Sequence, residues 1–161
     1  YHLRFNENRK MLNLENVNLN SKIDAETIHP SLKGLKWTTK KFENNSILEI
    51  ENLKKSIEII KNDKSKKMIE TNYLFFSAIV NEDLNNPSRW PTLGDASNPD
   101  FNNKYHFFYK EFINKIIEKK EIKSLYSTFD DQENFFFIFD KNCKSSELVE
   151  DFLYKIDLTK C

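Results

Sequence analysis

A short segment between two prolines holds the residues of this chain that are best suited to chemistry. The segment is NNPSRWP, residues 85–91, and it contains Ser88, Arg89 and Trp90. Proline fixes the backbone angle φ, so the two prolines should partly fix the directions of these side chains before a ligand arrives. The planar Arg guanidinium matches phosphate or carboxylate, and the Trp ring offers a flat face to a sugar ring or an acyl chain. We therefore predict that Ser88, Arg89 and Trp90 bind a ligand.

The same side chains could instead serve the structure of the protein. Trp90 would then close one end of the hydrophobic core, and Arg89 would pair with a nearby carboxylate such as Asp95. The two interpretations differ in what they expect of Trp90, which is nearly fully buried in the structural one and available to a ligand in the other.

Signatures of catalysis and of cofactor binding are not found in the sequence. There is no GxGxxG or Walker loop, and Gly34 and Gly94 are the only glycines, so a glycine-cradled phosphate site is not expected. The two cysteines have no metal-ligand spacing. We therefore predict no catalytic residue, no metal and no cofactor for these 161 residues alone.

Two further positions could bind a ligand, although each has an ordinary structural explanation. Asp130 and Asp131 follow a predicted strand, at the place where α/β enzymes put ligands, but a solvated turn has the same composition. His106 lies beside the apolar stripe of a predicted helix, where a surface histidine is more common than a ligand.

Length and charge limit what kind of protein this is. With 161 residues the chain is long enough to bury a core, and we expect a single domain over 1–161. The 25 basic residues equal the 25 acidic ones, and a net charge of zero argues against a nucleic-acid partner. No apolar run reaches the roughly 18 residues that a membrane span needs. Because the sequence starts at Tyr1 without a signal-peptide pattern, we expect part of a longer or processed chain.

Hydrophobic periodicity predicts helices and strands that alternate along the chain. Apolar residues at helical spacing predict a helix over 46–61, with Ser46 and Glu49 as its capping box. KMIET, residues 67–71, is typical of a short buried strand, and a helix over 73–80 should follow it.

The second half of this pattern begins with a long loop over 81–103, which contains three of the four prolines. A loop of this length in a compact domain often has a function. A second apolar stripe then predicts a helix over 104–119, and IKSLYS, residues 122–127, has the pattern of a strand.

The order strand, helix, loop, helix, strand is typical of an α/β fold. We predict a three-layer sandwich with a short, mainly parallel sheet flanked by helices. In it, 67–71 and 122–127 are neighbouring central strands, joined by a right-handed crossover that includes 104–119. Residues 41–161 should form this α/β core, and 1–40 a poorly defined N-terminal segment.

Other segments carry weaker patterns. Residues 24–28 could form one helical turn, and 35–39 (LKWTT) a short strand with Trp37 in the core. Residues 132–139 suit either a strand or a helix, and we favour a helix because a third repeat of helix and strand would then end in 152–158.

The cysteines, Cys143 and Cys161, have two interpretations. They are either two unrelated free thiols or a disulfide. The disulfide would close a loop of about 18 residues, stabilise the fold by roughly 3 kcal/mol and require an oxidising compartment.

Part of the chain resembles a known family. KKMIETNYLFFSAIVNEDLNNPSRW is similar to the soluble C-terminal part of bacterial polytopic membrane glycosyltransferases that use lipid-phosphate-linked sugars. Shared features are a strand ending in a small polar pair (Thr71–Asn72), an aromatic helix, a Pro-x-Arg-aromatic loop (Pro87–Trp90), and a long helix leading to a strand. The resemblance covers about residues 66–127.

This resemblance implies an extracytoplasmic α/β domain of the mannosyltransferase and aminoarabinose-transferase type. The domain would lie on the periplasmic face of a bacterial inner membrane and cover a membrane-embedded active site. Its partners would be the transmembrane portion of the parent chain and a lipid-linked sugar, and Ser88, Arg89 and Trp90 would help to bind that donor or acceptor. The catalytic base and the membrane helices of the family are not in this sequence, so these residues alone should not catalyse.

Two alternatives remain open at this point. The chain could be a free-standing soluble α/β module that binds an anionic ligand or a protein partner without catalysis. It could also be a small α/β hydrolase or transferase whose site has no recognisable motif.

Overall fold

The computed structural model describes most, though not all, of the chain. The described residues are 19–38, 46–88, 99, 102–128, 146–150 and 152–160. Contacts divide the chain into two compact units, Tyr1–Lys55 and Ser56–Cys161, with the border inside one helix. The expectation of one α/β domain over 1–161 stays a prediction.

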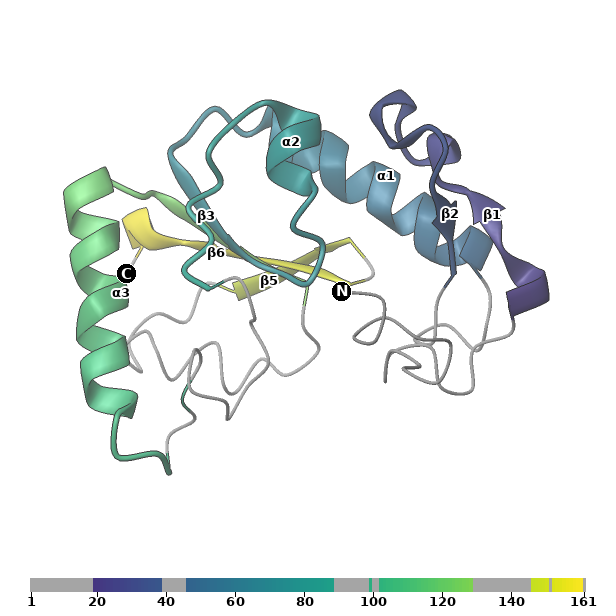
Figure 1. Cartoon of the computed structure of the whole chain (residues 1–161). Helices are drawn as coiled ribbons and strands as arrows, with labels where there is room; N and C mark the ends of the chain where they lie inside the picture. The colour runs from purple at the N-terminus through teal and green to yellow at the C-terminus, as the bar shows by residue number, and fades with distance from the viewer. Residues whose placement is uncertain are drawn as a thin grey trace. The chain divides into compact units, whose positions relative to one another are not determined.

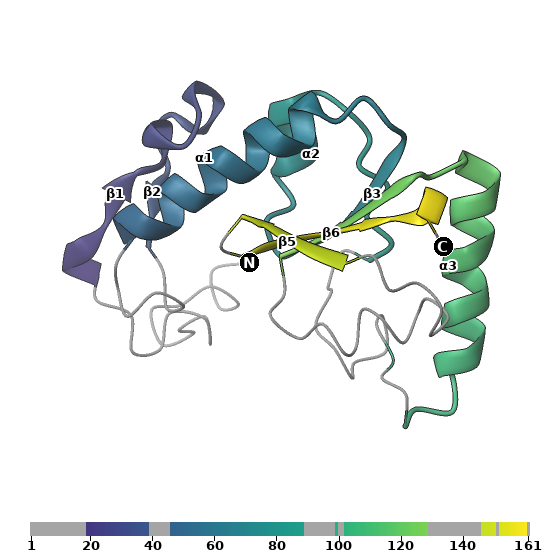
Figure 2. The same ribbon diagram turned by 180° about the vertical axis from the view of Figure 1, so that it is seen from behind.

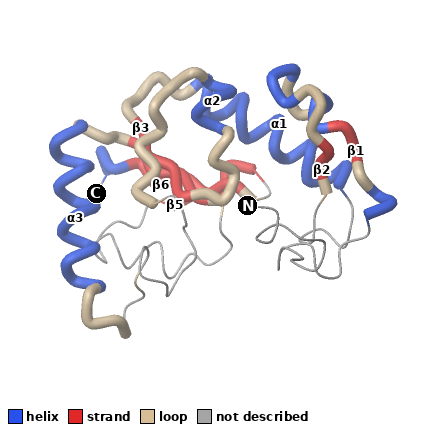
Figure 3. The backbone as a smooth tube through the Cα atoms, viewed as in Figure 1, coloured by secondary structure: helices blue, strands red, loops and turns tan. Residues whose placement is uncertain are grey.

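The first unit contains a two-stranded sheet and short helical turns. Strands β1 (Ile23–Asp24) and β2 (Lys36–Trp37) pair antiparallel, and a 3-10 turn, Ala25–Thr27, follows β1 (Figure 3). The predicted helical turn at 24–28 and the strand at 35–39 are thus confirmed, with shorter bounds. Trp37 is only partly buried, and its indole nitrogen donates a hydrogen bond of 2.9 Å to Glu49 Oε2.

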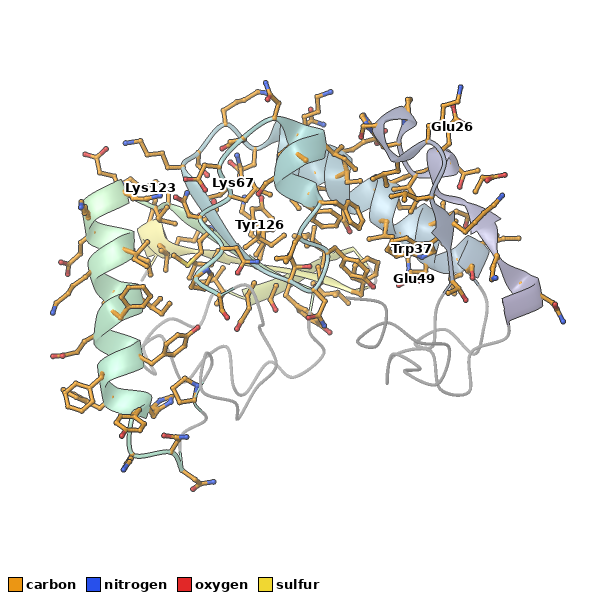
Figure 4. All side chains as sticks on the ribbon, viewed as in Figure 1. Glu26, Trp37, Glu49, Lys67, Lys123 and Tyr126 are labelled. Carbon is orange, nitrogen blue, oxygen red and sulfur yellow. The ribbon has the colours of Figure 1, made fainter. Side chains whose placement is uncertain are left out.

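Helix α1 (Ser46–Asn62) begins in the first unit and confirms the helix predicted over 46–61. The predicted capping role of Ser46 is wrong. Ser46 is the first helical residue, and its buried hydroxyl has no hydrogen-bond partner among the described residues. Glu49 is also buried, and Figure 4 labels it beside Trp37. A side-chain partner 12 residues away could not be read from local spacing.

The second unit is built on a four-stranded sheet in the order β3-β4-β6-β5 (Figures 1 and 2). Its strands are β3 (Lys67–Glu70), β4 (Ser124–Ser127), β5 (Ser146–Glu150) and β6 (Leu153–Asp157). β3 and β4 pair in parallel, with Lys67 opposite Ser124. β6 pairs antiparallel with both β4 and β5.

The predicted pairing of the first two strands is confirmed, and the structure is a mixed helix-and-strand fold with a small mixed sheet. The expected mainly parallel sheet is not confirmed, because two of the three described pairings in this sheet are antiparallel. Among the described strands, β3 is also at the edge of the sheet rather than in its centre. The strand predicted over 152–158 is confirmed as β6. It does not end a third helix–strand repeat, because it follows the strand β5 after two residues and pairs with it antiparallel. The helix favoured for 132–139 and both cysteines lie outside the described residues.

Two helices lie between β3 and β4 in sequence. α2 (Phe76–Val80) is shorter than the predicted 73–80 helix, and α3 (His106–Lys120) confirms the helix predicted over 104–119. Ile113 of α3 is fully buried in an apolar cluster with Met68, Ile122, Leu125 and Ile156. This cluster is the core on one side of the sheet. No helix in the described part of the chain is long and apolar enough to cross a membrane.

The opposite side of β4 is bound to the end of α1 through a carboxylate. Asp63 Oδ2 accepts hydrogen bonds from Tyr126 Oη (2.6 Å) and Lys155 Nζ (3.0 Å), while Oδ1 accepts from the Ser65 backbone nitrogen (2.8 Å). Tyr126 and Lys155 are directly opposite one another in the pairing of β4 with β6. Burial raises the pKa of Asp63, but the donors Tyr126, Ser65 and Lys155 lower it more, so the net pKa lies well below its usual value.

Replacement of Asp63 tests this network. A pKa lowered by folding means that the ionised carboxylate stabilises the fold fully above the unfolded-state pKa of about 3.9. This stabilisation is lost progressively as the pH falls from that value through the lower pKa of the folded state. Asp63→Asn should therefore lower the free energy of unfolding by about 2 kcal/mol at pH 7. The difference from the parent chain should shrink below about pH 4.

Urea unfolding followed by circular dichroism at several pH values measures both effects. Asp24→Asn is a matched control, because Asp24 also pairs with a lysine, Lys36, but on the exposed surface. It should change stability by less than about 1 kcal/mol. An equal loss for Asp63→Asn at pH 3 and pH 7 would contradict the role of the charge.

Candidate functional site

Polar side chains gather where the two parallel strands end. Thr71 and Thr128 directly follow β3 and β4, both are buried, and their hydroxyl oxygens are 2.8 Å apart. The Thr128 backbone nitrogen donates to the Glu70 carbonyl (3.2 Å), which continues the parallel pairing to this point. Glu70 and Ser127, the last residues of the strands, are also buried. We call this region the carboxyl edge.

The segment 82–88 runs along the side of β3 that does not face β4. It forms hydrogen bonds with every second residue from Lys67 to Thr71. The Ile69 backbone nitrogen donates to the Leu84 carbonyl (3.0 Å). Two asparagine amides continue the series: Asn85 Nδ2 donates to the Lys67 carbonyl (2.8 Å), and Asn86 Nδ2 to the Thr71 carbonyl (3.4 Å). A strand edge exposes donors and acceptors at alternate residues, and this segment satisfies three of them without forming a strand.

The segment is held by charged groups as well. Lys67 is buried, and its ammonium binds both carboxylate oxygens of Glu82 at 2.8 and 2.9 Å. From α3, Lys120 Nζ donates to Asn85 Oδ1 (2.5 Å) and Asp83 Oδ2 (3.0 Å). The Asn85 backbone nitrogen and Lys120 together hold the pKa of Asp83 below its usual value. Ion pairs therefore anchor the segment to both β3 and α3.

The path of this segment ends at the carboxyl edge. Ser88 is buried, and its backbone nitrogen donates to Asn86 Oδ1 (3.1 Å), while the amide of Asn86 reaches Thr71. Of the three predicted ligand-binding residues, Ser88 therefore lies beside the end of β3. The other two, Arg89 and Trp90, lie outside the described residues, as do Asp95, Asp130 and Asp131.

His106 has a structural partner in the fold. It is the first residue of α3, it is partly buried, and its Nδ1 lies 3.0 Å from the Pro99 carbonyl oxygen. This contact connects the start of α3 to the end of the long loop, rather than to the carboxyl edge.

The chemistry of the carboxyl edge is that of hydrogen bonding. A threonine hydroxyl both donates and accepts, and an asparagine amide does the same with its two ends. Thr71 Oγ1 also accepts from the Tyr73 backbone nitrogen (2.9 Å), so its position is set from two sides. Within the described ranges there is no group of three or more metal-ligating side chains. Such an edge can orient the hydroxyls of a sugar or the oxygens of a phosphate.

Several residues of this edge were not found by sequence reasoning. Thr128 lies outside the predicted binding segment, and only the pairing of β3 with β4 brings it to Thr71. Asn86 lies within NNPSRWP, but it was not among the three residues predicted there to bind a ligand. A usable signal did exist, because Thr71 ends the predicted strand 67–71 and Thr128 directly follows the predicted strand 122–127.

Comparisons with protein-family models, with curated proteins and with solved structures find no match to this chain.

The role of Asn85 can be separated into its amide and its backbone angle. Asn85 has φ of 51°, in the left-handed region that asparagine and glycine tolerate better than alanine. Asn85→Gly keeps this angle and removes the bonds to Lys67 and Lys120, so it should cost about 1 kcal/mol. Asn85→Ala should cost about 1 kcal/mol more, because it adds backbone strain. Urea unfolding of both variants measures the two costs, and equal values would contradict the strain.

Proposed function

We propose that the carboxyl edge binds the phosphate group of a lipid-linked sugar, in an accessory domain of a membrane glycosyltransferase. The family context comes from the resemblance over 66–127, and the ligand from the chemistry of Arg89 and Trp90. In this proposal the domain lies on the periplasmic face of a bacterial inner membrane. The transmembrane portion of the parent chain supplies the catalytic base, and this domain helps to hold the donor or acceptor.

One observation carries the proposal: the contact of Asn86 with the end of β3. Its amide hydrogen bond to the Thr71 carbonyl, and the bond from Ser88 to Asn86, direct the loop to the carboxyl edge just before Arg89. Ligands of open α/β sheets bind outside the carboxyl ends of the strands, where loops from neighbouring strands meet. The path of the loop therefore supports a ligand site at the carboxyl edge, because Arg89 and Trp90 directly follow Ser88 in the sequence.

The residue types indicate which part of the ligand each side chain would bind. The guanidinium of Arg89 would bind two phosphate oxygens at once, and the hydroxyl of Thr128 would donate to a third. The ring of Trp90 would pack on the sugar or on the first carbons of the lipid. We also propose that the second unit is completed as a three-layer sandwich, since Met68 packs toward α3 while Tyr126 binds the end of α1 from the other side of the sheet.

A free-standing module that binds an anionic ligand is the second candidate, and the same edge favours it. The two candidates differ in the ligand. The first requires the lipid-linked sugar phosphate as a whole, whereas the second requires only the anion. Comparison of ligands that contain the phosphate with and without sugar and lipid therefore separates them.

The fluorescence of a single tryptophan tests the proposal. Trp37→Phe leaves Trp90 as the one tryptophan, because the chain has two. A short-chain polyprenyl phosphate sugar should change the emission of Trp90 in a saturable way, and inorganic phosphate and free sugar should do so only at much higher concentration. Arg89→Ala in this background should weaken binding at least tenfold, because it removes a charge-assisted pair of hydrogen bonds.

Lys54→Ala, which removes one exposed positive charge on α1, is the control and should leave binding unchanged. The melting temperature should stay the same in both variants. A melting temperature lowered by several degrees in Arg89→Ala, without any ligand response in the parent chain, would favour the structural interpretation of the loop. Equal binding of inorganic phosphate and of the lipid-linked sugar would favour the free-standing module.

A further inference from the structure

Some apolar residues of α3 pack in the core, whereas most of its aromatic residues are exposed to solvent. Ile113 is buried, and Tyr109, Ile116 and Ile117 pack against the same core cluster. The other aromatic side chains of α3, and Tyr105 just before it, are exposed. Their exposed fractions are 57% for Tyr105, 63% for Phe107, 64% for Phe108 and 50% for Phe112. Exposed rings in this number on one short segment indicate an interaction surface.

Lysines continue the line of two of these rings. Phe108, Phe112, Lys115 and Lys119 are spaced by four, three and four residues, so they lie on one face of the helix. Both lysines are exposed, and Tyr105 lies at the start of the same face. We call these five residues the α3 face. Lys104 extends it, with its ammonium 4.9 Å from the centre of the Tyr105 ring.

The charged residues of the α3 face are both lysines, and α3 as a whole carries four lysines and two glutamates. The glutamates, Glu111 and Glu118, are exposed on the neighbouring row of Phe107, four and three residues from Lys115, so lysine is in excess around the face. The whole chain has no net charge, with 25 basic and 25 acidic residues, so any attraction to an anionic partner must be local. Rings that favour an apolar boundary, next to ammonium groups on long stems, match the interface of an anionic lipid bilayer.

We propose that the α3 face binds the surface of a membrane that contains anionic lipids. The rings of Phe108 and Phe112 enter the boundary between head groups and acyl chains, and Lys115 and Lys119 bind the lipid phosphates. The opposite side of α3 stays packed on the sheet through Ile113. This surface is separate from the carboxyl edge, so its membrane contact does not depend on the ligand proposed there.

Binding to vesicles tests this inference with the full 161-residue chain. The chain should sediment with vesicles of phosphatidylcholine mixed with phosphatidylglycerol, and much less with phosphatidylcholine alone. Lys115→Gln and Lys119→Gln should each weaken binding about fivefold, and added salt should weaken it further. Phe108→Ser with Phe112→Ser should reduce binding at least tenfold, because both rings lose their place in the lipid interface.

Matched controls come from exposed residues of the same kind elsewhere. Leu35→Ser and Lys54→Gln change an exposed apolar residue and an exposed lysine that do not belong to α3, and should bind vesicles like the parent chain. Equal binding to both kinds of vesicle, or none to either, would overturn the proposal. So would a ring variant that dissociates an oligomer of the free protein, which would assign the face to a second copy. A ring variant with a lower melting temperature would overturn it too, because the rings would then belong to the chain's own packing.

Discussion

The turn after α1 places one carboxylate, that of Asp63, against two neighbouring strands at once. Tyr126 and Lys155 are paired across β4 and β6, and both bind the same oxygen of Asp63. The carboxylate therefore receives all of its hydrogen bonds only under three conditions. Helix α1 must stop before Asp63, β4 must pair with β6 in the observed register, and the turn through Ser65 must form. Because a partly buried charge loses stabilisation when its hydrogen-bond partners are removed, this network favours one arrangement of helix and sheet over its alternatives.

The turn at Asp63 also determines where β3 begins. The outer edge of β3 then needs hydrogen-bond partners of its own. β3 begins four residues after Asp63 and pairs with β4 on one side only, so its outer edge needs other partners. The segment 82–88 supplies them with asparagine side chains and one backbone carbonyl. A loop used in this way protects the edge of β3 from pairing with another chain. The same contacts bring Ser88 to a defined place beside the end of β3. Stability and the position of the candidate site therefore have the same physical origin.

Helix α3 contributes to both proposed surfaces. It anchors the loop that leads to the carboxyl edge, and it carries the α3 face. Its buried side carries Ile113 into the core beside Met68 and Leu125, and Lys120 near its end binds Asn85 of the loop. Its other side carries exposed rings and lysines. A rigid helix held in this way can present a lipid-binding face while the loop that it anchors presents a ligand-binding edge. Neither surface requires the other to be occupied.

The sequence by itself determined the two long helices and the neighbouring strands β3 and β4, because periodic apolar residues record which side of an element is buried. It also singled out the loop over 81–103, which contains Ser88. It could not determine the partner of Asp63 in β4, 63 residues away, or the amide contacts of Asn85 and Asn86, since no local pattern encodes such pairs. Nor could periodicity distinguish the buried end of the α3 stripe from its exposed rings. That difference depends on which residues of the helix pack against Met68, Leu125 and Ile156 of the sheet, which only the tertiary structure decides.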